Sequence, residues 1–134
     1  MKAPSILWAD DDPDDIYIMR EVMLSLNNKL HITEVFNGQE ALHLLDEAKK
    51  FKNLPCLIVL DMNMPVLSGR ETLKLLKQDP VFRSIPTVVF TTSSSYLDKM
   101  FCAQLGNEML TKPVKLEELK GIMQKMLRLC GSSG

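Results

Sequence analysis

Short runs of apolar residues alternate along the chain with longer segments in which apolar residues recur every three or four positions. Short apolar runs bounded by polar residues or proline are typical of buried strands, whereas the longer recurrence is typical of the buried face of a helix. The runs predict strands over residues 5–9, 31–35, 56–60, 87–91 and 109–111. The apolar faces that predict a helix after each strand lie within residues 16–26, 41–48, 73–76, 97–105 and 116–126.

Polar residues at three of the predicted helix starts support this division. Asp12 precedes Pro13, and proline suits the first turn of a helix because its missing N–H needs no partner there. Asn37 and Ser68 each precede a glutamate by three residues. That spacing is typical of a capping box, in which side chains bind the free N–H groups of the first turn.

The regular alternation of strands and helices predicts an α/β fold with a five-stranded parallel sheet. Each parallel strand needs a right-handed crossover that returns over one face of the sheet. Helices should therefore cover both faces, which agrees with the apolar run at residues 56–60; residues 31–35 predict a strand more weakly. In such doubly wound sheets, ligands bind at the carboxyl ends of the strands.

The length and composition suit a single domain. With 134 residues, of which 46% are hydrophobic, the chain can bury a core; we assign residues 1–129 to the domain and 130–134 to a flexible tail, with no second domain. A formal net charge of −1 offers no general attraction for nucleic acid or anionic membranes. No segment resembles a signal peptide or a membrane span, so we expect a cytoplasmic protein that contacts neither directly.

The cysteines bear on the same question. There are three of them, Cys56, Cys102 and Cys130, and they are widely spaced. An odd number at this spacing favours reduced thiols in a cytosolic protein over a disulfide framework or a zinc site.

Chemically active residues follow the predicted strands. Asp10 and Asp11 end the first strand, and Asp61 ends the third. Thr91 ends the fourth strand, and Lys112 follows the fifth. Because the carboxyl ends of parallel strands share one edge of the sheet, we expect these side chains to lie together. Neighbouring carboxylates repel one another unless a cation lies among them, and oxygen ligands suit Mg²⁺.

Such a centre suits the transfer of a phosphoryl group to a carboxylate. Mg²⁺ and Lys112 would neutralise charge on the transferring oxygens, and Thr91 would donate a hydrogen bond. Each residue alone also has an ordinary structural explanation; an acidic run is typical of a solvated helix start, to which we assign Asp14 and Asp15. Their coincidence at one edge favours the functional interpretation.

The segments ILWADD, LIVLDMNMPVLSG, PTVVFTT and TKPV, in this order and spacing, resemble the receiver domains of two-component response regulators. The similarity covers residues 5–127 and is closest in kind to chemotaxis-type regulators that consist of a receiver alone. It implies a flavodoxin-like fold with strand order 2-1-3-4-5. The segment DPVFRSIPTVVFTTSSS also resembles single-domain regulators paired with phytochrome-like histidine kinases.

The resemblance implies roles for the acidic residues. Asp61 corresponds to the phosphoacceptor of a His-to-Asp phosphorelay. Asp10 and Asp11 correspond to the acidic pair that holds Mg²⁺ together with Asp61, with Asp11 as the more direct ligand. The backbone carbonyl of Asn63 would complete the protein ligands of the metal.

Further positions also match the family. Thr91 corresponds to the switch hydroxyl and Lys112 to the phosphate-binding lysine. The Lys112–Pro113 bond corresponds to a cis peptide, an isomer that is accessible at modest cost only before proline. Pro65 and Gly69 correspond to the shaped loop after the acceptor, where glycine fits a tight turn before a helix.

Two features depart from the family's pattern. Receivers usually carry Tyr or Phe three residues before the lysine, and this chain has Met109 there. The segment between Gly106 and Met109 is also one residue shorter than usual. Methionine is flexible and does not enforce two discrete positions, so we expect weaker coupling between the acceptor site and the output surface.

The resemblance further implies partners and a mode of action. The donor would be a sensor histidine kinase or a phosphotransfer protein, and the receiver would act on a downstream protein target. The protein would not be an enzyme beyond slow self-catalysed phosphorylation and dephosphorylation. The signal would leave through the fourth helix, fifth strand and fifth helix, which are also a candidate homodimer surface.

Other functions were weighed against the same residues. A phosphohydrolase of the haloacid dehalogenase type would need an aspartate in place of Asn63. A flavodoxin-like FMN site would need a loop that binds phosphate after the first strand, and the acidic residues 10–15 would repel the phosphate of FMN. A calcium loop starting at Asp10 lacks the glycine it needs, because Asp15 holds that place. The remaining alternative is a receiver-like module that binds partners without being phosphorylated.

Overall fold

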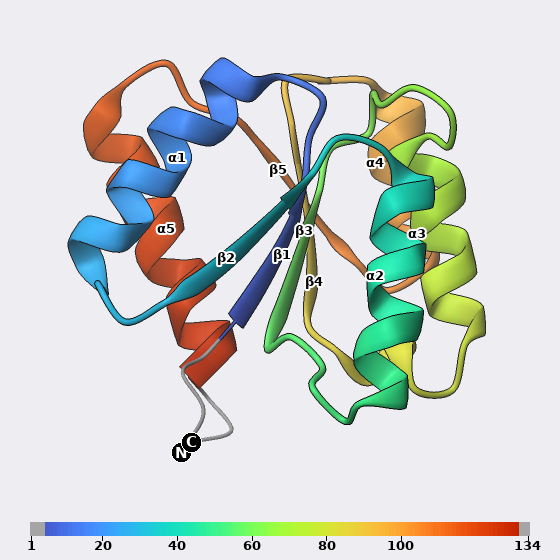
Figure 1. The fold of residues 1–134 in the computed structure, drawn as a ribbon. Coiled ribbons are helices and arrows are strands. Elements are labelled where there is room, and N and C mark those ends of the chain that lie inside the picture. Colours follow the sequence, from blue (N-terminus) through green and yellow to red (C-terminus); the bar gives the residue numbers. More distant parts are fainter. Residues whose placement is uncertain (1–4, 132–134) are drawn as a thin grey trace.

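The computed structural model describes residues 5–131, which form one parallel sheet between two helical layers (Figure 1). The strands pair in the order β2-β1-β3-β4-β5, as predicted. They are β1 (Ser5–Ala9), β2 (His31–Val35), β3 (Leu57–Leu60), β4 (Thr87–Thr91) and β5 (Glu108–Thr111). The helices are α1 (Pro13–Leu26), α2 (Gly38–Lys50), α3 (Gly69–Gln78), the 3₁₀ turn η1 (Phe82–Ser84), α4 (Tyr96–Gln104) and α5 (Leu116–Gly131).

The two faces of the sheet bury separate cores. Helices α1 and α5 cover one face, and α2, α3 and α4 cover the other (Figure 1). Side chains alternate along each strand, so Ile6 and Trp8 of β1 pack toward α1 and α5, while Leu7 and Ala9 pack toward the other layer. Burial on both faces explains why the central strand β3 is apolar at every position, whereas the edge strands β2 and β5 contain polar residues.

The predicted helix starts are confirmed. The Asp12 carboxylate accepts the backbone N–H of Asp14 at 3.0 Å, and the Asn37 side chain accepts that of Glu40 at 2.8 Å. Ser68 caps α3 in the same way. Because Asp12 and Ser68 follow directly on the loops that end β1 and β3, these caps fix where the chain turns away from the sheet edge.

Three boundaries differ from the prediction, and one of them is that of β5, which begins one residue earlier, at Glu108. Helix α5 extends through Gly131, so Cys130 and Gly131 are helical and do not begin a tail. The rest of the predicted tail, residues 132–134, lies outside the described residues. Strand β3 begins at Leu57, one residue later than predicted, although the N–H of Cys56 still donates to the Ser5 carbonyl of β1.

The prediction of three reduced cysteines was wrong. Cys56 and Cys130 form a disulfide that joins the start of β3 to the end of α5, with their Cα atoms 4.9 Å apart. The two residues are 74 positions apart in the sequence, and only the packing of α5 on the sheet brings them together. Cys102 is free and buried in the opposite core.

Helix α4 presents apolar residues to solvent. The periodic pattern predicted this helix correctly, but its apolar residues divide between two sides. Cys102 is buried, whereas Tyr96, Leu97 and Met100 are 73%, 68% and 41% exposed. Three apolar side chains on one short helix therefore lie uncovered beside β5.

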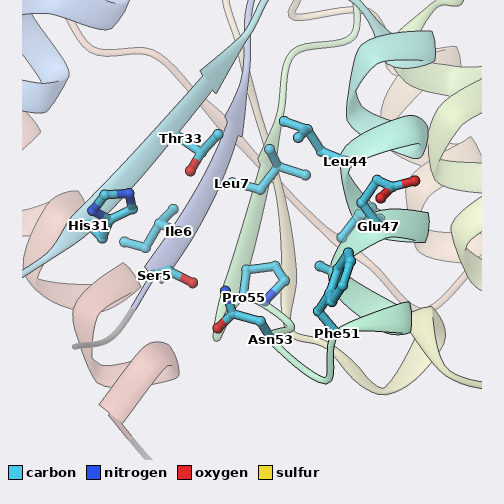
Figure 2. A pocket seen from close by; sticks show the side chains of 12 residues that line it. Ser5, Ile6, Leu7, His31, Thr33, Leu44, Glu47, Phe51, Asn53 and Pro55 are labelled. Carbon is cyan, nitrogen blue, oxygen red and sulfur yellow. The ribbon is translucent and has the colours of Figure 1, made fainter. Parts of the chain in front are cut away.

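A pocket of about 290 Å³ opens at the amino ends of β1 and β2, against α2. Leu7, Leu44 and Phe51 form its apolar wall, and His31 and Glu47 lie at its rim (Figure 2). It lies at the end of the sheet opposite to the carboxyl edge, where the polar residues converge. Within residues 5–131, no helix is long and apolar enough to cross a membrane.

Candidate functional site

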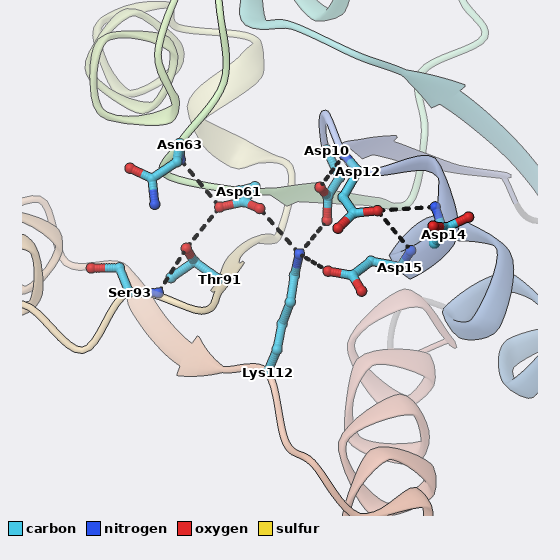
Figure 3. A network of polar contacts seen from close by, with 9 residues as sticks. All are labelled: Asp10, Asp12, Asp14, Asp15, Asp61, Asn63, Thr91, Ser93 and Lys112. Carbon is cyan, nitrogen blue, oxygen red and sulfur yellow. Dashed lines mark hydrogen bonds and ion pairs between the residues drawn. The ribbon is translucent and has the colours of Figure 1, made fainter.

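The predicted convergence of polar side chains at the carboxyl edge is confirmed. Asp10 follows β1, Asp61 follows β3, Thr91 ends β4 and Lys112 follows β5, and their side chains meet in one network (Figure 3). Asp10, Asp61 and Thr91 are 1%, 6% and 0% exposed. The order of the strands places β1, β3 and β4 side by side, so their ends are neighbours in space.

Asp61 lies at the centre of this network. Its Oδ1 accepts the Thr91 hydroxyl at 2.7 Å and the backbone N–H of Asn63 at 3.1 Å. Its Oδ2 lies 3.1 Å from the Lys112 ammonium. Each carboxylate oxygen thus has a hydrogen-bond donor in place, and the two donors orient the group.

Lys112 contacts three carboxylates at once. Its Nζ lies 2.5 Å from Asp10, 3.0 Å from Asp15 and 3.1 Å from Asp61. Burial of the ammonium works against its charge, but the hydrogen bond that it donates to Asp10 and the charges of Asp61 and Asp10 outweigh burial, and the pKa of Lys112 lies well above its usual value. The lysine is therefore a permanent positive charge within the site.

For Asp10, burial and hydrogen bonds also act on the pKa in opposite directions, and here burial has the larger effect. Burial raises the pKa of the Asp10 carboxyl to about 6, although hydrogen bonds from Lys112 and from the backbone of Asp12 act to lower it. The negative charge of Asp61 adds to the rise. One ammonium does not fully balance the carboxylates, so a further cation would be stabilised here.

The acidic residues have the arrangement that a divalent cation needs. One carboxylate oxygen from each of Asp10, Asp11 and Asp61 lies within 4.8 Å of the others. It is the one such cluster of three in the described part of the chain. The donors are all oxygens, and Asp11 is exposed, which leaves room for water ligands; both features fit Mg²⁺. The Asn63 carbonyl stays a predicted ligand.

Two contacts were missed by the sequence analysis. Asp15 was assigned to the solvated helix start, yet its carboxylate lies 3.0 Å from Lys112 Nζ. The Asp12 cap places Asp15 in the first turn of α1, but no local signal in the sequence indicates that this turn lies beside Lys112. Ser93 was not considered, and its backbone N–H donates to the Thr91 hydroxyl oxygen at 3.2 Å.

The loop between Asp61 and α3 is shaped by close backbone approach. Gly69 donates its N–H to the Met62 carbonyl at 3.1 Å, and a Cβ on Gly69 would lie 2.6 Å from the Met62 Cα. Glycine is therefore required by the space under Asp61. Farther along, Val66 has φ of 67° and lies in a tight turn in which the N–H of Leu67 donates to the Pro65 carbonyl.

Two predictions at the fifth strand have different outcomes. The predicted cis peptide before Pro113 is wrong, because the described chain contains no cis peptide bond. The trans isomer is the one that X–Pro bonds normally prefer. Met109 lies beside Val89 of β4 and packs, partly buried, against the core under α2, α3 and α4. Its effect on coupling stays a prediction.

A doubly wound parallel sheet with a carboxylate held between a lysine and a threonine at its carboxyl edge defines the receiver class of signalling domains. Residues 6–124 match the model of the response regulator receiver domain. The chain belongs to this family.

Several curated proteins are similar to the chain. It is 33% identical over 132 residues to the transcriptional regulatory protein PrrA of Mycobacterium tuberculosis, covering 98% of this chain and 53% of that protein. It is 27% identical over 127 residues to the sensor histidine kinase CheAY of Helicobacter pylori, covering 94% of this chain and 15% of the kinase. The chain thus spans about half the length of the regulators that it matches.

Solved structures share the whole fold. The phosphorylated cyanobacterial phytochrome response regulator RcpA is 29% identical with a TM-score of 0.85, over 98% of this chain and 96% of that one. The Mn²⁺-bound form of the response regulator Rcp1 is 30% identical with a TM-score of 0.81, over 93% and 92%. Both are response regulators in which a phosphoryl group or a divalent metal is present.

Proposed function

We propose that this chain accepts a phosphoryl group on Asp61 in a His-to-Asp phosphorelay. The observation that carries the proposal is the Asp61 carboxylate, which is oriented by the Thr91 hydroxyl on one oxygen and by Lys112 on the other. The proposal rests further on membership of the receiver family and on the phosphorylated state of the similar regulator RcpA.

In the proposed reaction, a carboxylate oxygen of Asp61 attacks the phosphorus of a phosphohistidine on the donor protein. A P–O bond to Asp61 forms as the P–N bond breaks, and the histidine nitrogen leaves with the electron pair. Lys112 Nζ, 3.1 Å from Asp61 Oδ2, neutralises charge that accumulates on the phosphoryl oxygens. Mg²⁺ bound by Asp10, Asp11 and Asp61, with the Asn63 carbonyl, would add a second positive charge on the same oxygens.

We assign no further catalytic activity to the chain. Asn63 stands two residues after the acceptor, where a phosphohydrolase of the haloacid dehalogenase type would need an acid, and its N–H serves Asp61. The position that supplies the general acid in that class therefore carries an amide here. The proposal is a phosphoacceptor with slow self-catalysed phosphorylation and dephosphorylation.

A donor protein must bring its histidine to the carboxylate edge, and the residues around that edge suit a protein contact. A pocket of about 270 Å³ beside Lys112 lies between the start of α1 and the loop into α5. Its walls include Ile18, Val114 and Leu116, which are 50%, 101% and 55% exposed. We propose this apolar rim as the contact for a sensor histidine kinase or a phosphotransfer protein.

The downstream target is proposed to bind at α4 and its neighbours. Tyr96, Leu97 and Met100 are exposed on α4, next to β5 and on the side of the edge where Thr91 ends β4. The same surface is our candidate for a homodimer contact. Location in the cytoplasm stays a prediction, and the cysteine argument for it no longer holds because Cys56 and Cys130 are paired.

The experiment that tests the acceptor is mass spectrometry after incubation with acetyl phosphate and Mg²⁺. The parent and the Asp14→Asn control should gain one phosphoryl group, because Asp14 is exposed and only its backbone N–H contacts Asp12. Asp61→Asn should gain none. Labelling of Asp61→Asn equal to that of the parent would refute the assignment.

The alternative, an interaction module that is never phosphorylated, predicts no label in the parent or in either variant. A phosphotransfer screen with purified histidine kinases of the host then identifies the donor. Transfer that depends on Asp61 and is weakened by Ile18→Asp would support the proposed contact on α1, where Ile18 is half exposed.

A further inference from the structure

A chain of side-chain contacts extends from the acceptor carboxylate to the outer helices. The Thr91 hydroxyl donates to Asp61 and accepts the backbone N–H of Ser93 at 3.2 Å. The Ser93 hydroxyl donates in turn to Asp98 Oδ2 at 2.8 Å. Asp98 is in the first turn of α4, so a contact on the reacting carboxylate continues into that helix.

The other oxygen of Asp98 extends the chain to α3. Asp98 Oδ1 accepts a hydrogen bond from Arg70 Nη2 at 2.8 Å. The Arg70 guanidinium also lies over the Phe101 ring of α4, with its carbon 4.4 Å from the ring centroid. Arg70 thus holds α4 at two places, by an ion pair and by a cation–π contact.

The series of contacts returns to the acceptor and forms a ring. Arg70 follows Gly69 directly, and the N–H of Gly69 donates to the Met62 carbonyl beside Asp61. One route from Asp61 to Arg70 is therefore through side chains of the loop between β4 and α4, and the other is through the backbone of the loop after β3. A displacement at either end of this ring must be accommodated within it.

Asp98 is suited to this place. Burial acts to raise its pKa, but the hydrogen bonds from Arg70 and Ser93 and the charge of Arg70 outweigh burial, and the pKa of Asp98 is lowered. Its side chain is 19% exposed, against 44% for Arg70. The carboxylate is thus charged at neutral pH and partly shielded, so its contact with Arg70 is stronger than that of an open surface pair.

We propose that Ser93, Asp98 and Arg70 form a clamp that holds α4 in its resting position and connects it to the state of Asp61. The proposal rests on the proposed phosphorylation of Asp61. A phosphoryl group adds strong acceptors above the carboxylate, and the Thr91 hydroxyl turns to them. The Ser93 N–H then loses its acceptor in the present position, and the loop that carries the Ser93 hydroxyl moves away from Asp98.

Release of the clamp would move α4, which bears the exposed Tyr96, Leu97 and Met100. The fifth strand has Met109 in place of a bulky aromatic, and the clamp gives residues 5–131 a contiguous polar connection between the acceptor and α4. Arg70, Asp98 and Ser93 are therefore positioning residues. They set the balance between two placements of α4 and do not touch the phosphoryl group.

The test is NMR of the parent, Arg70→Gln and Arg20→Gln, each with and without beryllofluoride and Mg²⁺, which mimic the acyl phosphate. Arg20→Gln is the matched control, because it removes an exposed ion pair of 3.0 Å between Arg20 of α1 and Glu34 of β2, away from α4. We expect unliganded Arg70→Gln to shift the signals of residues 96–104 along the line that joins the free and bound spectra of the parent. Its beryllofluoride affinity should rise roughly two- to five-fold, as expected for loss of a partly exposed pair that opposes the bound state.

The control should leave both quantities at the parent's values. Asp98→Asn should act in the same direction as Arg70→Gln, and the double variant should add little, because both changes break one contact. Signals of α4 in Arg70→Gln that match the parent, or effects no larger than those of Arg20→Gln, would overturn the clamp. A parent that takes no phosphoryl label and no beryllofluoride would instead refute the proposed function, so the two failures are distinct.

Discussion

The ammonium group of Lys112 lies 2.5 Å from Oδ2 of Asp10, a residue 102 positions earlier in the chain. Both groups are almost inaccessible, with side-chain exposures of 9% and 1%. The same ammonium also contacts Asp15 and Asp61. A single positive charge thus holds three carboxylates together, and we expect the stability of this edge of the sheet to depend on that charge.

Replacing Lys112 by Met keeps the alkyl volume and removes this charge. The carboxylates of Asp10 and Asp61 would then be buried without an opposite charge, and we expect the free energy of unfolding to fall by about 3 kcal/mol in EDTA. Mg²⁺ should restore more stability in the variant than in the parent, because it replaces the missing charge. Denaturant melts with and without Mg²⁺ measure both effects.

The matched control is Lys125→Met. Lys125 pairs with Glu108 at the surface, where both side chains are nearly half exposed, so its loss should change stability by less than about 1 kcal/mol. A Lys112→Met variant that is as stable as this control would show that the cluster does not need the lysine.

Asp11 should matter for metal binding and little for folding, because its carboxylate is exposed but lies within reach of Asp10 and Asp61. We expect Asp11→Ala to weaken Mg²⁺ binding by at least about ten-fold, the loss expected when one of three carboxylate ligands is removed. Calorimetric titration measures the affinity, and Trp8, the single tryptophan, reports by fluorescence from the strand that leads into the site.

Asp14→Ala is the control for this measurement, because Asp14 lies outside the acidic cluster. Asp15 is unsuitable, since it contacts Lys112. Equal losses in Asp11→Ala and Asp14→Ala would indicate a diffuse acidic patch in place of a metal site.

Met109 should weaken the coupling between Asp61 and the α4 surface. Its flexible side chain packs partly buried beside Val89, and it can adapt without two discrete positions. We expect Met109→Tyr to give larger beryllofluoride-induced chemical shift changes in α4 and β5 than the parent, through a larger population shift. If the tyrosine variant responds no more than the parent, an aromatic at this position is not what limits coupling here.

The disulfide between Cys56 and Cys130 should contribute to stability by closing a long loop. With 74 positions between the two cysteines, the chain-entropy model gives a contribution of about 4 kcal/mol. We expect reductant to lower the Tm of the parent and to leave the Tm of Cys130→Ser unchanged. Mass spectrometry should show two hydrogens fewer in the oxidised parent, and an identical mass under both conditions would contradict the pairing.

Val66 is held in a backbone conformation that β-branched residues rarely adopt, with φ of 67°, and it is 75% exposed. Asn tolerates this region better, so Val66→Asn should stabilise the protein by about 1 kcal/mol. Val114→Asn, at a fully exposed valine that lacks positive φ, should have little effect. A lower Tm for Val66→Asn than for Val114→Asn would show that the valine side chain makes a contact that outweighs the strain.

The sequence determined the elements and the place of the site. An apolar run such as residues 57–60 is a clear signal for a strand that is buried on both faces. Asp12, Asn37 and Ser68 indicated the helix starts, because their side chains bind backbone N–H groups only two or three residues away. Five parallel strands bring their carboxyl ends to one edge, so Asp10, Asp61 and Thr91 were bound to meet. These features depend on periodicity and on the covalent path of the chain.

The tertiary structure decided which side chains touch. Asp15 looked like one more solvated acid, and only the angle of α1 against the loop after β5 brings it to Lys112. The pairing of Cys56 with Cys130 and the Arg70–Asp98 contact likewise depend on how helices dock on the sheet. Helix docking is set by the packing of many side chains at once, and contacts between residues far apart in the sequence leave no local pattern to read.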